Sequence, residues 1–358
     1  MSPRQLFFLI LLTVPAYKIA MLPSYISQIS GVDGWITVLL PLLIDLLVLG
    51  AILWIKSRVG VLAYKRGVFL WITRIFAFFC IVLFALQFAV FGEESLNYLL
   101  QSFFDEGERA QIALPLIISA CYLAYKGAKV VGRVSDVFIW FFGFALLVSV
   151  VFNNAEIDFS NLKPILDGEV EKKLTGGIST YFWFGDYLPL LFIDVTDRKK
   201  KKPLLVLGGG LIATCLTSAL FAVFSAQWGD MTREIPNAFA RLSGYNIISA
   251  DVGKVDWVTI LAWLVCGVMR LTILSLGAVG AMKYLIGRES KFYAPAFGAI
   301  VTALLLLVVK DVRISYDLGG ALSLPTLIAT AVVIVGLVVF SLFDKKKGQE
   351  VRIYGQDS

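Results

Sequence analysis

Long apolar runs recur along the whole chain, and they restrict it to one environment. The 358 residues are 58% hydrophobic and only 16% charged. A water-soluble domain cannot cover that much apolar surface with so few polar side chains. Runs of about 18 apolar residues or more are long enough to cross the hydrocarbon core of a bilayer as helices. The sequence therefore predicts an all-α polytopic membrane protein in contact with the lipid bilayer.

Ten such segments can be placed, and their short linkers fit one compact helical bundle. Residues 1–344 are expected to form a single transporter-like transmembrane domain, followed by a short cytoplasmic tail at 345–358. The first five spans make one repeat over about 5–152, and the last five make a second over about 176–343. The predicted spans are 5–29, 34–55, 68–91, 109–125, 134–152, 176–196, 203–226, 255–282, 292–309 and 321–343.

Charges between the spans set the predicted orientation. With the N-terminus inside, every cytoplasmic loop contains lysine or arginine, as the positive-inside rule requires. Loops on the opposite side are rich in acids, and Glu93 and Glu94 are assigned to one of them. Both chain ends are then cytoplasmic. The basic residues on the cytoplasmic side are Lys56, Arg58, Lys65, Arg66, Lys126, Lys129, Arg133, Arg198 to Lys202, Lys283, Arg288, Lys291 and Lys345 to Lys347.

Two of the predicted spans are interrupted by the same dipeptide beside a charge. Leu22-Pro23 follows Lys18 in the first span, and Leu188-Pro189 follows Asp186 in the sixth. Proline removes a helical N–H donor and clashes with the preceding turn. The first and sixth spans cross in opposite directions, so the two halves form an inverted repeat with broken helices 1 and 6. Such paired breaks are typical of transporter-type binding sites, and a plain proline kink is the alternative.

The broken ends predict a binding site for a small solute. Unwound backbone is tolerated at membrane depth only where it lines protein or a wet cavity. Half-helix ends offer N–H groups to a carboxylate and carbonyl groups to an ammonium, which suits an amino acid. The candidate ligand-binding residues are Ala16, Tyr17, Lys18, Phe184, Gly185, Asp186, Tyr187 and Arg270.

Charged residues inside the spans are predicted to form a charge network, because an unpaired charge in the bilayer is costly. Lys18 lies about 13 residues, or roughly 20 Å, into its span, which disfavours snorkelling to the surface. It has three open roles: pairing with Asp186, binding a ligand carboxylate, or replacing a bound cation. Arg270 needs a partner, either Asp45 or Asp186, and both a structural and a functional role are open. The predicted network is Lys18, Asp45, Asp186 and Arg270.

Sequence signals of catalysis are missing. Histidine is absent, and there is no Walker loop, nucleophile elbow, dinucleotide fingerprint or metal-ligand spacing. The sequence therefore predicts no enzyme, no metal and no other cofactor. Its basic runs are interpreted as topology determinants next to anionic headgroups rather than as nucleic-acid sites.

Short motifs spread over nearly the whole chain resemble one known family. They are Ser2-Pro3-Arg4-Gln5-Leu6-Phe7, Leu22-Pro23, Asp33-Gly34-Trp35, Tyr125-Lys126-Gly127, Gly132-Arg133, Asp158 to Pro164, Phe184-Gly185-Asp186, Leu188-Pro189, and Trp263 followed by Arg270. In this order and spacing the chain resembles the B-subunit family of spore germinant receptors (GerAB type). That family belongs to the amino acid–polyamine–organocation (APC) superfamily.

The resemblance implies a ten-helix LeuT-like fold that senses a nutrient, often an amino acid, in the inner membrane of a dormant spore. It also implies A-type and C-type receptor subunits as partners. The chain departs from the family pattern at Tyr17-Lys18, where small residues are usual. A fixed cation there would either favour an anion or exclude ordinary amino acids. A proton-coupled secondary amino acid transporter of the same superfamily is the alternative function.

Overall fold

A computed structural model describes most of the chain. The described residues are 1–59, 68–103, 109–151, 157–163, 165, 170–193, 203–234, 247–249, 253–254 and 256–354. The basic run from Arg198 to Lys202, used above for orientation, lies outside them, as do Lys65 and Arg66. The side chains of Ala16 and Tyr17 also lie outside this description, although the backbone there is helical.

Helices dominate the described residues, and the only sheet among them is a two-stranded hairpin. The helices are α1 (Pro3–Ser30), α2 (Gly34–Thr37), α3 (Leu39–Val59), α4 (Val68–Phe103), α5 (Arg109–Lys126), α6 (Ala128–Val151), α7 (Val170–Ile178), α8 (Pro203–Trp228), α10 (Asp256–Ile286), α11 (Tyr293–Ala303) and α12 (Val312–Tyr354). The hairpin pairs β1 (Ile247–Ser249) with β2 (Gly253–Lys254). Short turns of 3-10 helix are η1 (Gly31–Asp33), η2 (Phe159–Leu162), η3 (Tyr181–Trp183), η4 (Leu188–Leu191) and η5 (Gly229–Arg233), and η6 (Leu304–Val308) is a π-helical turn that continues α11.

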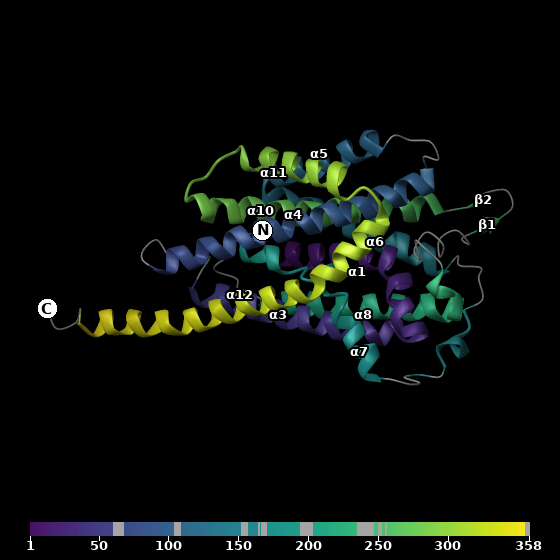
Figure 1. Cartoon of the computed structure of the whole chain (residues 1–358), viewed down its shortest axis with the longest axis horizontal. Helices are drawn as coiled ribbons and strands as arrows, with labels where there is room; N and C mark the ends of the chain where they lie inside the picture. Colours follow the sequence, from purple (N-terminus) through teal and green to yellow (C-terminus); the bar gives the residue numbers. More distant parts are fainter. Residues whose placement is uncertain are drawn as a thin grey trace.

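The long helices run side by side along one axis of the molecule (Figure 1). α10 packs against α4, α5, α6 and α1, and α1 also packs against α8. The turn between α10 and α11 lies at the same end of the bundle as the C-terminus, and the β1–β2 hairpin lies at the opposite end (Figure 1). α1 and α10 therefore carry Lys18 and Arg270 into the middle of the bundle.

Six helices in the described residues are long and apolar enough to cross a bilayer. They are Leu39–Ser57, Thr73–Leu100, Ala128–Val148, Pro203–Arg233, Val258–Ile286 and Arg313–Val339. Each overlaps one of the ten predicted spans, although several ends differ from the predicted ones. The other four predicted spans fall on α1, α5, the broken sixth span, and α11 with η6.

The outer surface of the bundle is apolar, as a lipid environment requires. Large hydrophobic side chains point outward from several of the long helices, including Leu47 on α3, Trp140 on α6 and Leu204 on α8, which are 75%, 74% and 82% exposed. In water, such a surface would drive aggregation. Its position around the long helices identifies an integral membrane protein in contact with the bilayer.

The structure corrects the prediction for the first span. α1 is one continuous α-helix from Pro3 to Ser30 with Pro15 and Pro23 inside it. The prediction that helix 1 is broken is therefore wrong. Each proline removes only one N–H donor, and neighbouring helices hold such a helix in membranes. α1 packs against α8, α6 and α10, which supplies that support.

The sixth span is broken over a longer stretch than expected. α7 ends at Ile178, and residues 179–193, here called the broken segment, contain only the turns η3 and η4 joined by non-helical residues. Every residue from Thr180 to Ile193 is buried. A buried, irregular chain at this depth depends on the surrounding helices for its hydrogen bonds.

A second correction concerns the acidic residues assigned to a loop. Glu93 and Glu94 lie within α4, which continues to Phe103, and both are fully buried. Glu93 forms an ion pair with Arg109 at the start of α5. A span defined by hydrophobicity alone ends at residue 91, because the two glutamates that follow are charged. In the structure, packing and polar contacts keep both glutamates inside the helical bundle.

The broken segment packs tightly against two glycines of α10. A Cβ atom built on Gly277 would lie 2.6 Å from Cβ of Pro189, and one on Gly280 would lie 2.5 Å from the carbonyl oxygen of Phe192. Real side chains do not approach so closely. Glycine at these positions therefore lets α10 contact the broken segment directly.

We predict that Gly277→Ala lowers the free energy of unfolding by about 1–3 kcal/mol, the usual cost of overpacking a core. The matched control is Gly208→Ala on α8, where a new Cβ meets nothing within 4 Å. Thermal unfolding of both variants in detergent, followed by circular dichroism, measures the difference. Equal melting temperatures for the two variants would contradict the close contact.

Candidate functional site

The broken segment turns at Gly185, which has a φ of +77°. That conformation is strained for any residue with a side chain. The preceding residue, Phe184, is extended, with φ −100° and ψ −156°. Because the chain is not helical here, its N–H and C=O groups lose their usual partners and need others.

Asp45 of α3 supplies acceptors for the backbone at this turn. Its carboxylate accepts from the N–H of Gly185 at 2.9 and 3.1 Å and from the N–H of Asp186 at 3.1 Å. The hydroxyl of Tyr181 donates to the same carboxylate at 3.2 Å. Asp45 thus acts as a cap for the broken segment, in the way that a carboxylate caps a helix N-terminus.

Two further helices satisfy the backbone on either side. The side-chain amide of Gln87 on α4 donates to the carbonyl oxygens of Phe182 and Phe184 at 2.9 and 3.0 Å. The N–H of Phe182 donates to Ser323 Oγ of α12 at 3.0 Å. Side chains from α3, α4 and α12 therefore replace the hydrogen bonds that a continuous helix would make for itself.

Asp186 lies between two cations from different helices. Lys18 of α1 donates to Oδ2 of Asp186 and forms an ion pair with it. Arg270 Nη2 of α10 lies 2.6 Å from Oδ1 of the same carboxylate. All three side chains are at most 2% exposed. With Asp45 nearby, two acids face two bases, so the formal charges of the group balance.

Each cation also lies over an aromatic ring. Lys18 Nζ is 4.8 Å from the ring centre of Phe184, and Arg270 Cζ is 5.0 Å from that of Phe91. Cation–π contacts of this kind are stronger when desolvated. Nε and Nη1 of Arg270 have no hydrogen-bond acceptor among the described residues. The guanidinium therefore has donor capacity that its ion pair does not use.

A second polar contact lies beside this charge network. Glu94 Oε1 accepts from Trp183 Nε1 at 2.8 Å. Trp183 lies beside Tyr25 of α1 and Tyr316 of α12, with ring centres at 5.1 and 6.2 Å, and the two tyrosines stack on each other at 5.1 Å. These contacts join α1, α4, α12 and the broken segment through Trp183 and Glu94, which are buried, and Tyr25 and Tyr316, which are partly buried.

The structure brings most of the residues selected from the sequence together. Lys18, Asp45, Asp186 and Arg270 meet at the turn formed by Phe184 and Gly185. Tyr187 is buried, and its hydroxyl lies near Gly210 of α8. The side chains of Ala16 and Tyr17 lie outside the described residues. A ligand-binding role for any of these residues stays a prediction.

Gln87, Glu94 and Ser323 belong to this region but do not stand out in the sequence as a site. The sequence does indicate Gln87 as a candidate, because an uncharged polar residue deep inside an apolar run needs a hydrogen-bond partner. Glu94 lies two residues after Gly92, beside a second acid at the apparent end of its span, so the sequence gives no sign that it is buried. Ser323 has no signal, since serine is common in membrane helices.

An apolar helical bundle with a buried ion-pair network at an unwound segment defines a class: polytopic membrane proteins with an internal polar site. A comparison of the sequence with family profiles identifies the particular family. The profile of the spore permease family, described as spore germination protein, matches residues 1–312. The chain therefore belongs to the spore germination protein family. A comparison with curated proteins found no match.

We predict that Lys18 and Asp186 are energetically coupled. Lys18→Met leaves Asp186 with Arg270 alone, and Asp186→Asn leaves two cations facing each other, so each single variant is expected to lose about 3–5 kcal/mol. The double variant should lose less than the sum by about 1–3 kcal/mol. Unfolding free energies in mixed detergent micelles measure this cycle.

The control cycle uses Arg4→Met and Asp136→Asn, whose side chains pair at 3.3 Å with Arg4 69% exposed. A surface pair of this kind is worth at most about 1 kcal/mol. Effects at Lys18 and Asp186 that simply add, as in the control, would contradict the buried pair.

A further prediction concerns the cap. Asp45→Ala removes the acceptor of two buried N–H groups, and each such group costs about 1–3 kcal/mol when left without a partner. Asp45→Asn keeps one acceptor oxygen and is expected to lose distinctly less. Melting temperatures in detergent rank the two variants. If both variants melt alike, the charge of Asp45 matters and its capping role does not.

Proposed function

We propose that the chain is the nutrient-sensing membrane subunit of a spore germinant receptor. The proposed ligand site lies between α1, α4, the broken segment and α10. A small ligand bound there would change the partners of Asp186 and so shift the position of the broken segment. Membership of the spore germination protein family supports the biological setting of this proposal.

The observation that carries the proposal is the sharing of Asp186 between Lys18 and Arg270. The three residues come from three separate elements, and both cations pair with the single carboxylate of Asp186. A ligand that contributes a charge of its own changes this balance and so favours a different arrangement. Burial makes the effect large, because little water screens it.

The proposed ligand is a small solute with a carboxylate group, such as an amino acid or a related compound. Nε and Nη1 of Arg270 are donors without acceptors among the described residues, and they suit a carboxylate. Lys18 already fills the position beside Asp186 that a ligand ammonium would take. A ligand ammonium would therefore have to displace Lys18, and a simple carboxylate would not.

The proposed architecture is the LeuT-like 5+5 inverted repeat with ten membrane crossings. The order of the apolar segments supports it, since each half begins with an element that contributes to the Lys18–Asp186 pair. The proposed location is the spore inner membrane. Both ends of the chain are proposed to be cytoplasmic, because most of the basic loop residues lie on the predicted cytoplasmic side of the spans. A-type and C-type subunits are the proposed partners, and no catalytic activity is proposed.

The alternative function is proton-coupled transport of an amino acid. The direct contact between Lys18 and Asp186 favours it, because proton transfer from the ammonium to the carboxylate would neutralise both groups together. Purified protein in liposomes distinguishes the two functions. Saturable uptake that depends on an imposed proton gradient would favour transport by the protein alone.

The proposal predicts altered nutrient responses in spores that carry site variants. Arg270→Lys keeps the charge but loses the planar donors. Loss of a charge-assisted hydrogen bond is expected to raise the half-maximal nutrient concentration on the order of tenfold to a hundredfold. Lys18→Ala is expected to change the dose–response while leaving membrane insertion intact. Germination assays over a nutrient titration measure both.

The matched control is Arg133→Lys on α6, where the side chain is exposed. Immunoblots of spore membranes show whether each variant is present at the wild-type level. Unchanged dose–response curves for both Lys18→Ala and Arg270→Lys, at normal protein levels, would refute the ligand site.

A further inference from the structure

A cavity of about 830 Å³ lies away from the charge network, at the end of the bundle where several helices begin or end. α5 ends there at Lys126, α6 begins at Ala128, and α11 begins at Tyr293. The last turn of α10, with Lys283, forms another wall. Because long membrane helices end near the water interface, the cavity lies at the level of the lipid headgroups.

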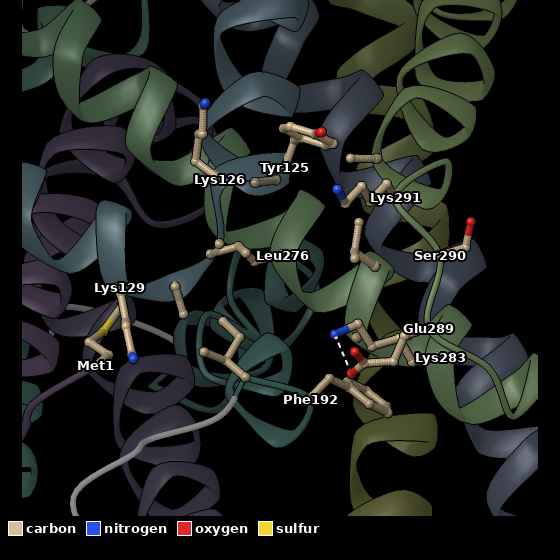
Figure 2. Close-up of a pocket in the computed structure, with 17 residues that line it drawn as sticks. Met1, Tyr125, Lys126, Lys129, Phe192, Leu276, Lys283, Glu289, Ser290 and Lys291 are labelled. Carbon is tan, nitrogen blue, oxygen red and sulfur yellow. Dashed lines mark hydrogen bonds and ion pairs between the residues drawn. The ribbon is translucent and has the colours of Figure 1, made fainter.

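The cavity is basic. Four lysines and one glutamate are the only charged residues among its described lining: Lys126, Lys129, Lys283, Lys291 and Glu289. Figure 2 shows these side chains distributed around the cavity, with Lys129 beside Met1 and Lys283 next to Glu289. Lys283 pairs with Glu289 at 3.0 Å, and none of the other three lysines has a carboxylate partner among the described residues. The site therefore offers positive charge to an anion.

An apolar groove of about 420 Å³ continues from the cavity between α5 and α11. Tyr125 and Ala294 line both spaces, so the two are adjacent. Ile118 and Tyr122 of the groove are 63% and 55% exposed on the outer surface of the bundle. The groove carries no charged residue in its described lining and faces the hydrocarbon of the bilayer.

An aromatic–cation contact links the two spaces. Lys126 Nζ lies 5.1 Å from the ring centre of Tyr122, so the lysine sits above the groove and the tyrosine inside it. Tyrosine and lysine are the residues that mark the boundary between hydrocarbon and headgroups. The basic cavity therefore lies where the charged headgroup of an amphiphilic molecule would lie, and the apolar groove lies deeper in the membrane, where its hydrocarbon chain would lie.

We propose that this cavity and groove form a binding site for an anionic phospholipid, with the phosphate near Lys126 and Lys291, Lys129 farther along the same basic wall beside Met1, and one acyl chain along the α5–α11 groove. Basic pockets between membrane helices bind anionic headgroups in this way. The acyl chain gains little free energy over bulk lipid, because both surroundings are apolar. The lysines set the preference for an anionic lipid, and the groove sets its position.

The test uses the full chain in nanodiscs of equal phosphatidylglycerol and phosphatidylcholine, with retained lipids counted by native mass spectrometry. Wild-type protein is expected to retain phosphatidylglycerol in preference to phosphatidylcholine. Each lysine near a membrane surface contributes about a fivefold preference, so Lys126→Gln with Lys291→Gln should reduce it about 30-fold. The charge-matched control is Lys310→Gln with Arg313→Gln, two exposed cations outside the cavity lining. Equal retention of both lipids by wild type, or equal loss in both double variants, would overturn the proposal.

A second pair of variants tests the groove. Ala299→Phe fills it, whereas Ala296→Phe adds the same side chain to an exposed position of α11 outside the groove. The first is expected to reduce the retained phosphatidylglycerol and the second to leave it unchanged.

Free anions are tested by adding soluble glycerol phosphate to the same nanodiscs. Weak competition at millimolar concentration supports a lipid site, because a soluble headgroup lacks the high local concentration that the bilayer gives to a lipid. Full displacement at micromolar concentration, together with no effect of Ala299→Phe, would identify a site for a soluble phosphate instead and overturn the lipid assignment.

Discussion

One carboxylate holds the centre of this protein together. Asp186 binds Lys18 of α1 and Arg270 of α10, while its own backbone N–H is held by Asp45 of α3. Four elements therefore meet at a single residue that itself lies in an unwound stretch. Removing any one charge leaves another uncompensated in a low-dielectric interior, which is far more costly than losing a surface pair. The arrangement is consequently both a structural tie and a point at which a small added charge has a large effect.

The unwound stretch is possible only because other helices complete its hydrogen bonds. Gln87 donates to two of its carbonyl oxygens, and Ser323 accepts from one of its N–H groups, as Asp45 accepts from the N–H groups at the turn. Gly277 brings α10 close enough for direct contact on another side. The broken segment is thus shaped by its surroundings rather than by its own helical preference. That is why its sequence looks like a normal span apart from Gly185, Asp186 and Pro189.

The sequence was sufficient to predict the break at Gly185 and to select the charged residues that meet there, because glycine, proline and charge are costly in a membrane helix. It was misleading for α1, where the prolines suggested a break that the packing of neighbouring helices prevents. It also placed Glu94 in a loop, although Trp183 holds it inside. Both errors have the same cause. The sequence shows that a proline or a carboxylate is unfavourable within a membrane helix, but it does not show which distant side chains pack against it or pair with it.

The contact between Phe182 and Ser323 has a mechanical consequence. From Ser323, α12 continues for 31 residues to Tyr354, or about 47 Å at helical rise, and it extends beyond the rest of the bundle (Figure 1). Pro325 interrupts the hydrogen-bond ladder close to the contact, so the helix is most easily bent there. By simple geometry on that length, a tilt of about 5° at this pivot would move the far end of a rigid helix by roughly 4 Å. A small movement of the broken segment at Ser323 would therefore produce a larger movement at the C-terminal end of α12.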